Sequence, residues 1–328
     1  RVVVAASREL SPVWPFLIVG ASLILMQSGG SLKRFFPPSS TGLAADRKRQ
    51  IAAFMRTIHT DTKSSAEASS KMRMKAVTFD LDDTVWKGFE TLQNAHANMF
   101  RWLEENTPKT AEKYDSNGFR KLMGSMREKH PSIAHNFTAL RKKALEVAFE
   151  ETGYEVKENV ENAFNAFITA RNDVLLYDDS LRAVKALRDR GMIVGAITNG
   201  NADVWETKQM GELFDFAIKA EDAGKPKPSK EPFEIAVACC REVLKDVEAA
   251  HPSEEPTAGS LGWNVVESEI MHVGDCLRSD VHGAKQAGFF AIWINRGANG
   301  GKSLGTREGV ETKPDFVVRG LDEIAAKL

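Results

Sequence analysis

Five short apolar runs, separated from one another by helical or irregular stretches, constrain the fold of this chain more than any other feature. They are rich in Val, Ile and Phe and predict strands at Lys75 to Phe79, Met192 to Thr198, Phe216 to Lys219, Ile270 to Gly274 and Phe290 to Asn295. Strands that are apolar on both faces are typical of a parallel sheet covered by helices on both sides. We therefore expect an α/β fold with a Rossmann-like parallel sheet.

A long stretch without strand character separates the first two predicted strands. Apolar residues recur there at helical spacing, at Leu92, Ala95, Met99, Trp102 and Leu103 and again at Leu140, Ala144, Val147 and Ala148. The pattern predicts a helical module over residues 89–177, inserted into a sheet domain made of residues 72–88 and 178–328. A second insertion, residues 248–263, is rich in Pro, Glu, Ser and Gly and predicts a surface loop.

Composition limits the partners that the folded part can have. A chain of 328 residues is long enough for one large α/β domain with an inserted module. Its formal net charge of -1 provides no long-range attraction to nucleic acid or to a membrane, so we expect neither as a partner of the folded domain. The three cysteines lack the spacing of a zinc site, and we expect reduced thiols. The oligomeric state is left open.

Residues 1–71 differ from the rest and are expected to form a targeting or disordered extension. An apolar run from Pro12 to Met26 follows Arg1 and Arg8, like the core of a signal peptide, and is shorter than the roughly 20 residues of a membrane span. The segment after it is rich in Ser, Lys and Arg, as in organelle transit segments, and shows no core-forming pattern. A targeting segment, spurious upstream translation and a membrane anchor all remain open. The expected location is accordingly a plastid, a mitochondrion or the cytoplasm.

Polar motifs follow four of the predicted strands. Because the carboxyl ends of parallel strands meet at one edge of a sheet, where ligands of such folds bind, these motifs should converge. They are Asp80-Leu81-Asp82-Asp83-Thr84, Thr198-Asn199-Gly200-Asn201, Lys225-Pro226-Lys227-Pro228 and Gly274-Asp275-Cys276-Leu277-Arg278-Ser279-Asp280.

The residue types of these motifs suit phosphoryl transfer. Converging carboxylates repel one another unless a cation lies between them, and an all-oxygen site suits Mg²⁺, with Asp275 as one ligand. A carboxylate such as Asp80 is a nucleophile towards phosphorus, and Asp82 is placed to act as acid and base. Thr198 and Lys227 supply a hydroxyl and a positive charge for phosphate oxygens.

In order and in strand context, these motifs resemble the four signature motifs of the haloacid dehalogenase superfamily, over about 255 residues from Met74 to the end. The resemblance implies that Asp80 is the nucleophile and a metal ligand. It makes Asp82 the general acid and base, with its backbone carbonyl also on the metal. It assigns Mg²⁺ coordination to Asp275 and support of the site to Asp280. The inserted helices correspond to the superfamily's C1 cap, which closes over the site and selects the substrate.

The resemblance also assigns the phosphate-binding groups and the type of reaction. Thr198 holds the phosphate, together with Asn199 and Gly200. Dehalogenases of the superfamily lack an acid two residues after the nucleophile, because halide leaves without a proton, whereas an alkoxide needs one. Asp82 therefore favours hydrolysis of a phosphate ester.

Two lysines compete for the third motif. Both Lys225 and Lys227 precede a proline. In similar proteins this lysine lies six positions before an aromatic residue that opens the next helix, which is Phe233 here. The spacing favours Lys227 as the residue that stabilises the aspartyl-phosphate.

Within the superfamily, the chain resembles bacterial phosphatases of riboflavin biosynthesis, which act on 5-amino-6-(5-phospho-D-ribitylamino)uracil and often on FMN. The likeness lies in the runs Ala196 to Ala202, His272 to Val281 and Ala291 to Ile294, and in the cap run His135 to Thr138 with Arg141. It implies that His135 and Arg141 bind the substrate's ring or ribityl end. An alternative is a phosphatase for another nucleotide or sugar phosphate, and an alternative of a different class is a non-catalytic binding protein with this fold.

Several other residues have plainer interpretations. Trp86 is equally consistent with packing and with a wall for the substrate. His272 and His282 fit packed or surface positions better than catalytic ones, since carboxylates already fill the acid and base roles. The run from Gly300 to Ser303 is not a P-loop, because Arg296 occupies the place of the motif's first glycine.

Overall fold

The structure is a computed structural model that describes residues 31–38, 43–64, 73–251, 263–297 and 312–327. Three predictions fall outside these ranges: the apolar run at residues 12–26, the run at residues 300–303, and most of the loop at residues 248–263. Within the described ranges, the structure contains no helix with the length and apolar character needed to cross a membrane.

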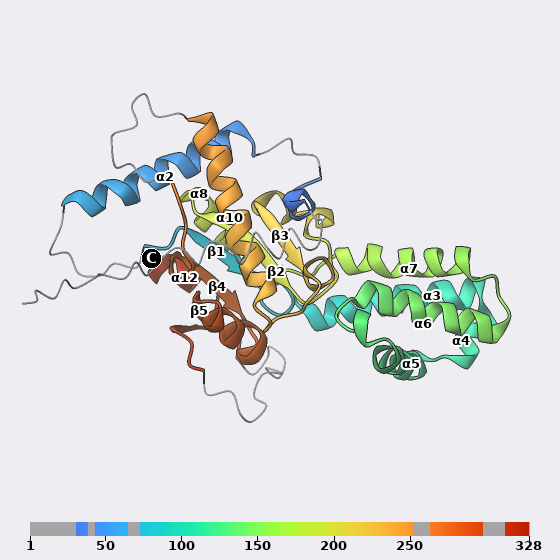
Figure 1. The fold of residues 1–328 in the computed structure, drawn as a ribbon. Coiled ribbons are helices and arrows are strands. Elements are labelled where there is room, and N and C mark those ends of the chain that lie inside the picture. Colours follow the sequence, from blue (N-terminus) through green and yellow to red (C-terminus); the bar gives the residue numbers. More distant parts are fainter. Residues whose placement is uncertain (1–30, 39–42, 65–72, 252–262, 298–311, 328) are drawn as a thin grey trace, which may run out of the picture.

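A six-stranded parallel sheet forms the centre of the molecule (Figure 1). Its strands lie in the order β3-β2-β1-β4-β5-β6 and comprise β1 (Ala76–Phe79), β2 (Ile193–Thr198), β3 (Phe216–Lys219), β4 (Ile270–Gly274), β5 (Phe290–Ile294) and β6 (Phe316–Val318). The five predicted strands are confirmed to within one residue at each end. The sequence missed β6, because Phe316 and Val317 are exposed and the strand shows no buried apolar run.

The register of the central strands aligns the chain segments that carry the polar motifs. Phe79, the last residue of β1, lies opposite Ala196 in β2 and Val273 in β4. The residues that follow these positions leave the sheet at the same edge. The central place of β1, with its neighbours on either side, thus brings three of the motifs together.

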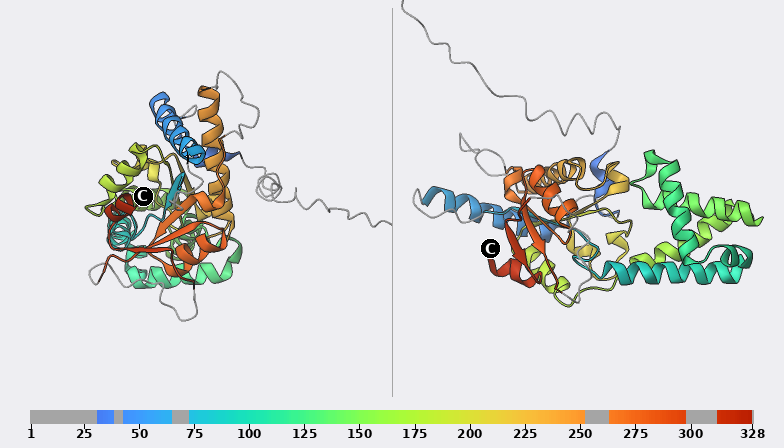
Figure 2. Two further views of the ribbon diagram at one scale, coloured as in Figure 1. Left: turned by 90° about the vertical axis from the view of Figure 1, so that its left-hand side faces the viewer. Right: turned by 90° about the horizontal axis from the view of Figure 1, so that it is seen from below.

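Helices cover both faces of the sheet, as its doubly apolar strands require (Figure 2). One face packs on α10 (Glu231–Ala250), through residues such as Phe233 and Val243. The other packs on α8 (Ser180–Asp189) and α12 (Asp322–Lys327), through Val184 and Leu187 among others. The remaining short elements of this domain are η3 (Val204–Glu206), η4 (Gly211–Leu213), α9 (Ala220–Ala223), η5 (Glu267–Glu269), η6 (Leu277–His282) and α11 (Gly283–Gln286).

The segment between β1 and α8 is helical and lies to one side of the sheet domain (Figure 1). Its elements are α3 (Gly88–Asn106), α4 (Pro108–Lys113), α5 (Ser116–Lys129), η2 (Pro131–Ile133), α6 (Phe137–Thr152) and α7 (Lys157–Asn172). We call these elements the cap. The cap has a hydrophobic cluster of its own, which includes Met99, Leu103, Phe149 and Phe167.

The expectation that no core-forming pattern precedes Met74 is wrong for residues 31–38 and 43–64. These residues form η1 (Leu32–Phe35) and α2 (Ala45–Ser64), and α2 packs against α10. Ile51, Ala52 and Met55 are buried in the same cluster as the sheet. Sequence reasoning overlooked this helix because its apolar stripe is short and the helix is otherwise strongly polar.

A buried ion pair ties α2 to the sheet domain. Arg47 donates to both carboxylate oxygens of Asp215, over 2.9 Å from Nε and 2.6 Å from Nη2, and Asp215 is completely buried. Arg188 donates to the same carboxylate over 2.7 Å. Burial alone would raise the pKa of Asp215, but the two guanidinium groups hold it below its ordinary value. A helix held in this way belongs to the folded domain.

Candidate active site

Asp80 stands where β1 ends, at the edge of the sheet. Its backbone N–H donates to the carbonyl of Val273 over 2.8 Å, which continues the pairing with β4 by one residue. The chain then turns sharply at Asp83, whose φ of 60° lies in the left-handed region that aspartate tolerates better than most residues. The turn fixes the Asp80 side chain at the sheet edge while the chain departs into the cap.

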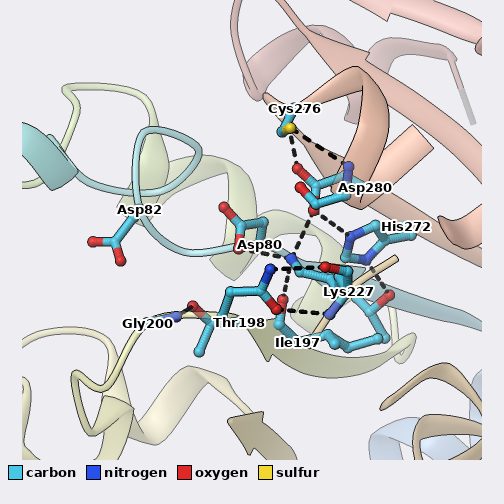
Figure 3. A network of polar contacts seen from close by, with 12 residues as sticks. Asp80, Asp82, Ile197, Thr198, Gly200, Lys227, His272, Cys276 and Asp280 are labelled. Carbon is cyan, nitrogen blue, oxygen red and sulfur yellow. Dashed lines mark hydrogen bonds and ion pairs between the residues drawn. The ribbon is translucent and has the colours of Figure 1, made fainter. Parts of the chain in front are cut away.

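Lys227 is the centre of the polar network around Asp80 (Figure 3). Its buried ammonium group donates to Asp80 Oδ1 and to Asp280 Oδ1, each over 2.7 Å, and to the carbonyl of Ile197 over 2.5 Å. These three acceptors use all three N–H bonds of the ammonium group. Burial would lower the pKa of Lys227, but the carboxylates of Asp280 and Asp80 raise it above its ordinary value, so the lysine is charged.

Asp280 anchors this network to β4. A Cβ atom on Gly274 would lie 2.3 Å from Asp280 Cγ, so only glycine allows the carboxylate to come this close to the strand. Asp280 Oδ2 accepts from the N–H of Cys276 over 2.9 Å, and His272 lies 3.4 Å from Oδ1. Burial would raise the pKa of Asp280, yet Lys227 holds it well below its ordinary value.

The carboxylates at this edge form a group suited to a divalent cation. Oxygen atoms of Asp80, Asp275 and Asp280 all lie within 4.8 Å of one another. Burial, together with the neighbouring carboxylates, raises the pKa of Asp80 to about 7 and that of Asp275 to about 8, despite the opposing charge of Lys227. Such mutual repulsion among oxygen ligands is relieved by an ion such as Mg²⁺.

Hydrogen bonds already occupy both oxygens of Asp280, which accept from Lys227 and from the Cys276 N–H. Asp80 and Asp275, the two side chains that the sequence assigns to the cation, belong to the same carboxylate group. Trp293 positions Asp275 by donating from its indole N–H to the Asp275 carbonyl over 2.8 Å.

The loop after β2 supplies donors beside Asp80. Thr198 is buried at the strand end, and its hydroxyl accepts from the N–H of Gly200 over 3.0 Å. The side chain of Asn199 contacts the third motif, and the expected contact of Asn199 with the phosphate stays a prediction. The Asn199 amide donates to the Lys227 carbonyl over 3.0 Å and accepts from the Lys227 N–H over 2.8 Å. It thereby joins the second motif to the third.

The Asp82 carboxylate does not point towards Asp80, as its expected role as acid and base would require. It points away from the network of Asp80 and Lys227 (Figure 3). Asp82 Oδ1 accepts from the indole N–H of Trp86 over 2.8 Å, and Oδ2 accepts from Arg171 Nη2 over 2.5 Å. Arg171 belongs to the last turn of α7, so the side chain expected to be the general acid is bound to the cap.

The cap places Arg141, but not His135, in a polar cluster. Arg141 is buried on α6, 3.0 Å from His96 Nε2, and its guanidinium group lies 3.6 Å from the centre of the Phe167 ring. His135 lies in the turn before α6, partly exposed. The neighbouring Asn136 caps that helix, accepting from the Ala139 N–H over 2.7 Å. Much of the cap run that carried the resemblance is therefore a helix start.

Two residues of this cluster escaped sequence reasoning. Arg171 continues the buried stripe of α7 after Phe164 and Phe167, and His96 adjoins the buried stripe of α3 beside Ala95. A charged or titratable residue in line with an apolar stripe was the available signal. Burial and, to a smaller extent, the positive charges of Arg141 and Arg171 lower the pKa of His96 to about 4. The imidazole is therefore neutral at neutral pH.

The other candidates have clear positions. Lys225 forms a 3.4 Å ion pair with Glu231 at the surface and takes no part in the network around Asp80. Trp86 is completely buried, which favours the packing interpretation over a substrate wall. His272 is packed against Phe233 under the site. His282 lies on η6 and bonds to Thr312 over 2.7 Å.

The N-terminal segment also reaches this region. A cavity of about 250 Å³ is lined on one side by Lys33, Arg34 and Phe36 and on the other by residues that include Thr198 and Trp205. The segment before β1 therefore forms part of the surroundings of the second motif.

Comparison with known proteins matches a family model and several relatives to this chain. The family model described as haloacid dehalogenase-like hydrolase matches residues 74–288. The 5-amino-6-(5-phospho-D-ribitylamino)uracil phosphatase YigB of Escherichia coli is 29% identical over 225 residues, which cover 68% of this chain and 84% of the relative. The phosphoserine phosphatase of Thermus thermophilus is 26% identical over 188 residues, 56% of this chain and 63% of the relative.

A similar solved structure carries a different activity in its name. The crystal structure of a 2-haloacid dehalogenase from Pseudomonas syringae pv. tomato has a TM-score of 0.61 and 30% sequence identity. The similarity covers 77% of this chain and 97% of that protein. The choice between ester hydrolysis and dehalogenation therefore depends on individual residues of the site.

Proposed function

Because this chain belongs to the haloacid dehalogenase-like hydrolase family, we propose that it is a Mg²⁺-dependent phosphomonoester hydrolase that forms an aspartyl-phosphate on Asp80. The observation that carries the proposal is the contact of Lys227 with Asp80 in a buried carboxylate cluster. A nucleophile next to a fixed positive charge suits attack on a phosphoryl group, whose oxygens bring negative charge to the site. Two curated relatives are named as phosphatases.

The reaction proceeds in two displacements at phosphorus. An oxygen of Asp80 bonds to phosphorus while the bond to the leaving oxygen breaks, and Asp82 gives that oxygen its proton. Asp82 then takes a proton from water, whose oxygen attacks phosphorus and releases phosphate from Asp80. Both steps require the Asp82 carboxyl to leave Trp86 and Arg171, which bind it in this structure.

The surrounding groups hold the phosphate and balance its charge. Lys227 faces the nucleophile, and the Thr198 hydroxyl with the N–H of Gly200 lies at the adjacent strand end. Mg²⁺ held by Asp80, Asp275 and the carbonyl of Asp82 would neutralise negative charge on the phosphoryl oxygens. The orientation of phosphorus towards Asp80 thus comes from donors at the end of β2 and from Lys227, in the loop between α9 and α10.

Asp82 supports ester hydrolysis over dehalogenation. A halide needs no proton to leave, whereas an alkoxide does, and Asp82 is the acid two residues after the nucleophile. The first experiment compares a chromogenic phosphate ester with a 2-haloacid, each with Mg²⁺ and with excess chelator. Mg²⁺-dependent release of phosphate without release of halide is the expected result. Halide release alone would overturn the assignment, and no activity on any ester would favour a non-catalytic binding protein.

The proposed substrates are 5-amino-6-(5-phospho-D-ribitylamino)uracil and FMN. Support comes from the similarity to YigB, whose name specifies the first of these, over 84% of its length. A panel of these two compounds with sugar phosphates, nucleotides and 2-phosphoglycolate tests the proposal. The first two should have the highest kcat/KM. A tenfold advantage for a sugar phosphate or a nucleotide would instead favour the alternative of a different phosphorylated metabolite.

A further inference from the structure

Two arginines of the cap are buried without enough acceptors for their N–H groups. Only 6% of Arg141 and 3% of Arg171 is exposed. Within the described residues, Arg141 Nε, Arg171 Nε and Arg171 Nη1 are buried and have no hydrogen-bond partner. Arg171 forms an ion pair with Asp82. Among the described residues, no other carboxylate forms an ion pair with either guanidinium group. Buried guanidinium groups are normally paired and fully hydrogen-bonded, so this arrangement is costly as it stands.

The two arginines lie side by side and form one cluster. Arg141 on α6 stacks over the ring of Phe167 at 3.6 Å, and Phe167 precedes Arg171 by one turn of α7. Burial and, to a smaller extent, the positive charge of Arg171 lower the pKa of Arg141 to about 9. His96 completes the cluster as a neutral side chain and adds no negative charge.

The cluster is directed at the site described above. A Cβ atom placed on Gly200 would lie 3.0 Å from Arg171 Nη2 and 3.3 Å from Thr198 Oγ1. The Arg171 guanidinium group is thus adjacent to the loop that follows β2. Close to it, Asn201 of the same loop donates to Thr138 of α6 over 3.3 Å, which joins the cap to the sheet domain at this point.

We propose that Arg141 and Arg171 bind oxygen acceptors on the leaving group of the substrate, and that Arg171 releases Asp82 when it does so. The inference rests on the proposed phosphatase function and specifies the class of its substrate. Phosphate itself belongs with Asp80, Thr198 and Lys227, so the cap donors meet the other end of the molecule. Oxygen acceptors there would satisfy the buried N–H groups.

The chemistry of the cluster selects among leaving groups. A cationic end would be repelled by two guanidinium groups, and an apolar end would leave their N–H groups unpaired. Two sources of paired oxygen acceptors fit the same donors: a pyrimidinedione ring, as in FMN and the ribitylaminouracil phosphate, and a carboxylate. A carboxylate accepts two parallel N–H bonds from one guanidinium group. The two carbonyl oxygens of the ring lie on either side of a ring N–H, so each would accept from a different N–H group of the cluster.

Release of Asp82 follows from competition for one donor group. Arg171 Nη2 is bound to Asp82 Oδ2, and the acid must turn towards Asp80 before it can protonate the leaving oxygen. The unpaired N–H groups of Arg171 are on Nε and Nη1. A substrate oxygen that draws the guanidinium group towards itself through these atoms would break the Nη2 contact and free Asp82 for this rotation. Arg171 is in this sense a positioning residue, which couples recognition of the leaving group to the availability of the acid.

The experiment uses matched substrates with the wild-type protein. Phenyl phosphate, 4-carboxyphenyl phosphate and FMN are compared by kcat/KM, with choline phosphate as the cationic case. At least one acceptor-bearing ester should exceed phenyl phosphate by about 10- to 100-fold, the usual scale when buried donors lose their partners. An advantage for FMN alone identifies the ring as the source, and one for the carboxyphenyl ester identifies the carboxylate. Preference for phenyl or choline phosphate overturns the proposal.

Variants test the two arginines directly. In Arg141→Met and Arg171→Met, the ratio of kcat/KM between the preferred ester and phenyl phosphate should fall towards one. Arg171→Lys should retain part of that ratio. Arg101→Met, an exposed substitution on α3, is the matched control and should leave the ratio unchanged. An unchanged ratio in folded Arg→Met variants overturns the proposal. Should these variants not fold, the wild-type comparison decides. Failure to hydrolyse even phenyl phosphate would instead count against the phosphatase function.

Discussion

The ammonium group of Lys227 lies 2.7 Å from a carboxylate oxygen of Asp80, although 147 residues separate them in the chain. The contact exists because β1 and β3, which lie on either side of β2 in the parallel sheet, deliver the segments that follow them to one edge. A second carboxylate, Asp280, lies at the same distance from the ammonium group. One positive charge is therefore shared by two acids, and this arrangement underlies several of the expectations below.

Replacement of Lys227 should be far more harmful than replacement of Lys225. Lys227→Ala removes a charge that faces the nucleophile, and kcat should fall by roughly 10²- to 10³-fold, the scale for loss of one preorganised charge donor. Lys225→Ala alters only a surface ion pair with Glu231 and should stay within about twofold of wild type. Steady-state kinetics on a chromogenic ester compares the two. The reverse order would show that the wrong lysine was assigned.

Loss of Asp82 should depend on the leaving group. Asp82→Asn should slow hydrolysis of an alkyl phosphate by about 10²- to 10⁴-fold, because an alkoxide must be protonated as it leaves. The loss should be smaller for 4-nitrophenyl phosphate, whose leaving group needs little protonation. Asp178→Asn, at an exposed position, is the control. Equal losses for both esters would indicate that Asp82 does not act as the acid.

Much of this site was predictable because parallel strands impose convergence. The motifs at Asp80, Thr198 and Asp275 each follow a predicted strand directly, and strand direction places them at one edge. Lys227 comes after α9, and the Asn199 side chain binds its backbone at that edge. The direction in which Asp82 points was not predictable, since it depends on bonds to Trp86 and to Arg171 of a distant helix. Motif spacing carries no information about such a side-chain rotation.

Arg171 and the helix α2 were not predicted, because the sequence pattern around each of them is typical of an exposed segment. Arg171 was missed because a single arginine in an apolar stripe resembles a solvated residue until the packing is known. The helix α2 was missed because its few buried residues are surrounded by charged ones, and its main anchor, Arg47 with Asp215, is a contact between distant parts of the chain.

The stabilising effect of Mg²⁺ should increase with pH. Without a cation, burial raises the pKa of Asp80 to about 7 and that of Asp275 to about 8, against an ordinary value of 3.8. Raised pKa values favour the protonated forms in the folded protein. The stability that these two groups contribute is therefore present at low pH and lost as the pH rises through 7 to 8. Mg²⁺ requires the ionised forms, so its binding strengthens over the same window.

Thermal unfolding with Mg²⁺ and with chelator measures this effect. The increase in Tm caused by Mg²⁺ should be larger at pH 8.5 than at pH 6. Asp275→Asn, which removes one proposed ligand, should lose most of the increase at pH 8.5. An increase that is equal at both pH values, or larger at pH 6, would contradict the assignment of these carboxylates to the cation.

Two N-terminal deletions, one that ends before η1 and one that ends after α2, should have different effects on stability. Deletion of residues 1–30 leaves η1 and α2 in place and should preserve a folded, active protein. Deletion of residues 1–71 removes Arg47 from the buried Asp215 and the apolar contacts of Ile51 and Met55. The free energy of unfolding should then fall markedly, contrary to the sequence-based expectation of a targeting or disordered extension.

A point substitution isolates the ion pair. Arg47→Met should lower the free energy of unfolding by about 3 to 5 kcal/mol, the usual cost of removing one partner of a buried pair. Arg49→Met, which breaks an exposed pair with Asp46, should change it by less than about 1 kcal/mol. Chemical denaturation of both variants gives the comparison. Equal effects would mean that α2 is not anchored through Arg47.

Covalent capture of phosphate tests the central claim, that Asp80 is the nucleophile. Wild-type protein is mixed with a ³²P-labelled ester and Mg²⁺, quenched in acid during turnover, and digested into peptides. Label is expected on the peptide that contains Asp80, removable by hydroxylamine as an acyl phosphate, and no label is expected in the Asp80→Asn variant. Label on a different residue, or label that persists in Asp80→Asn, would contradict this claim.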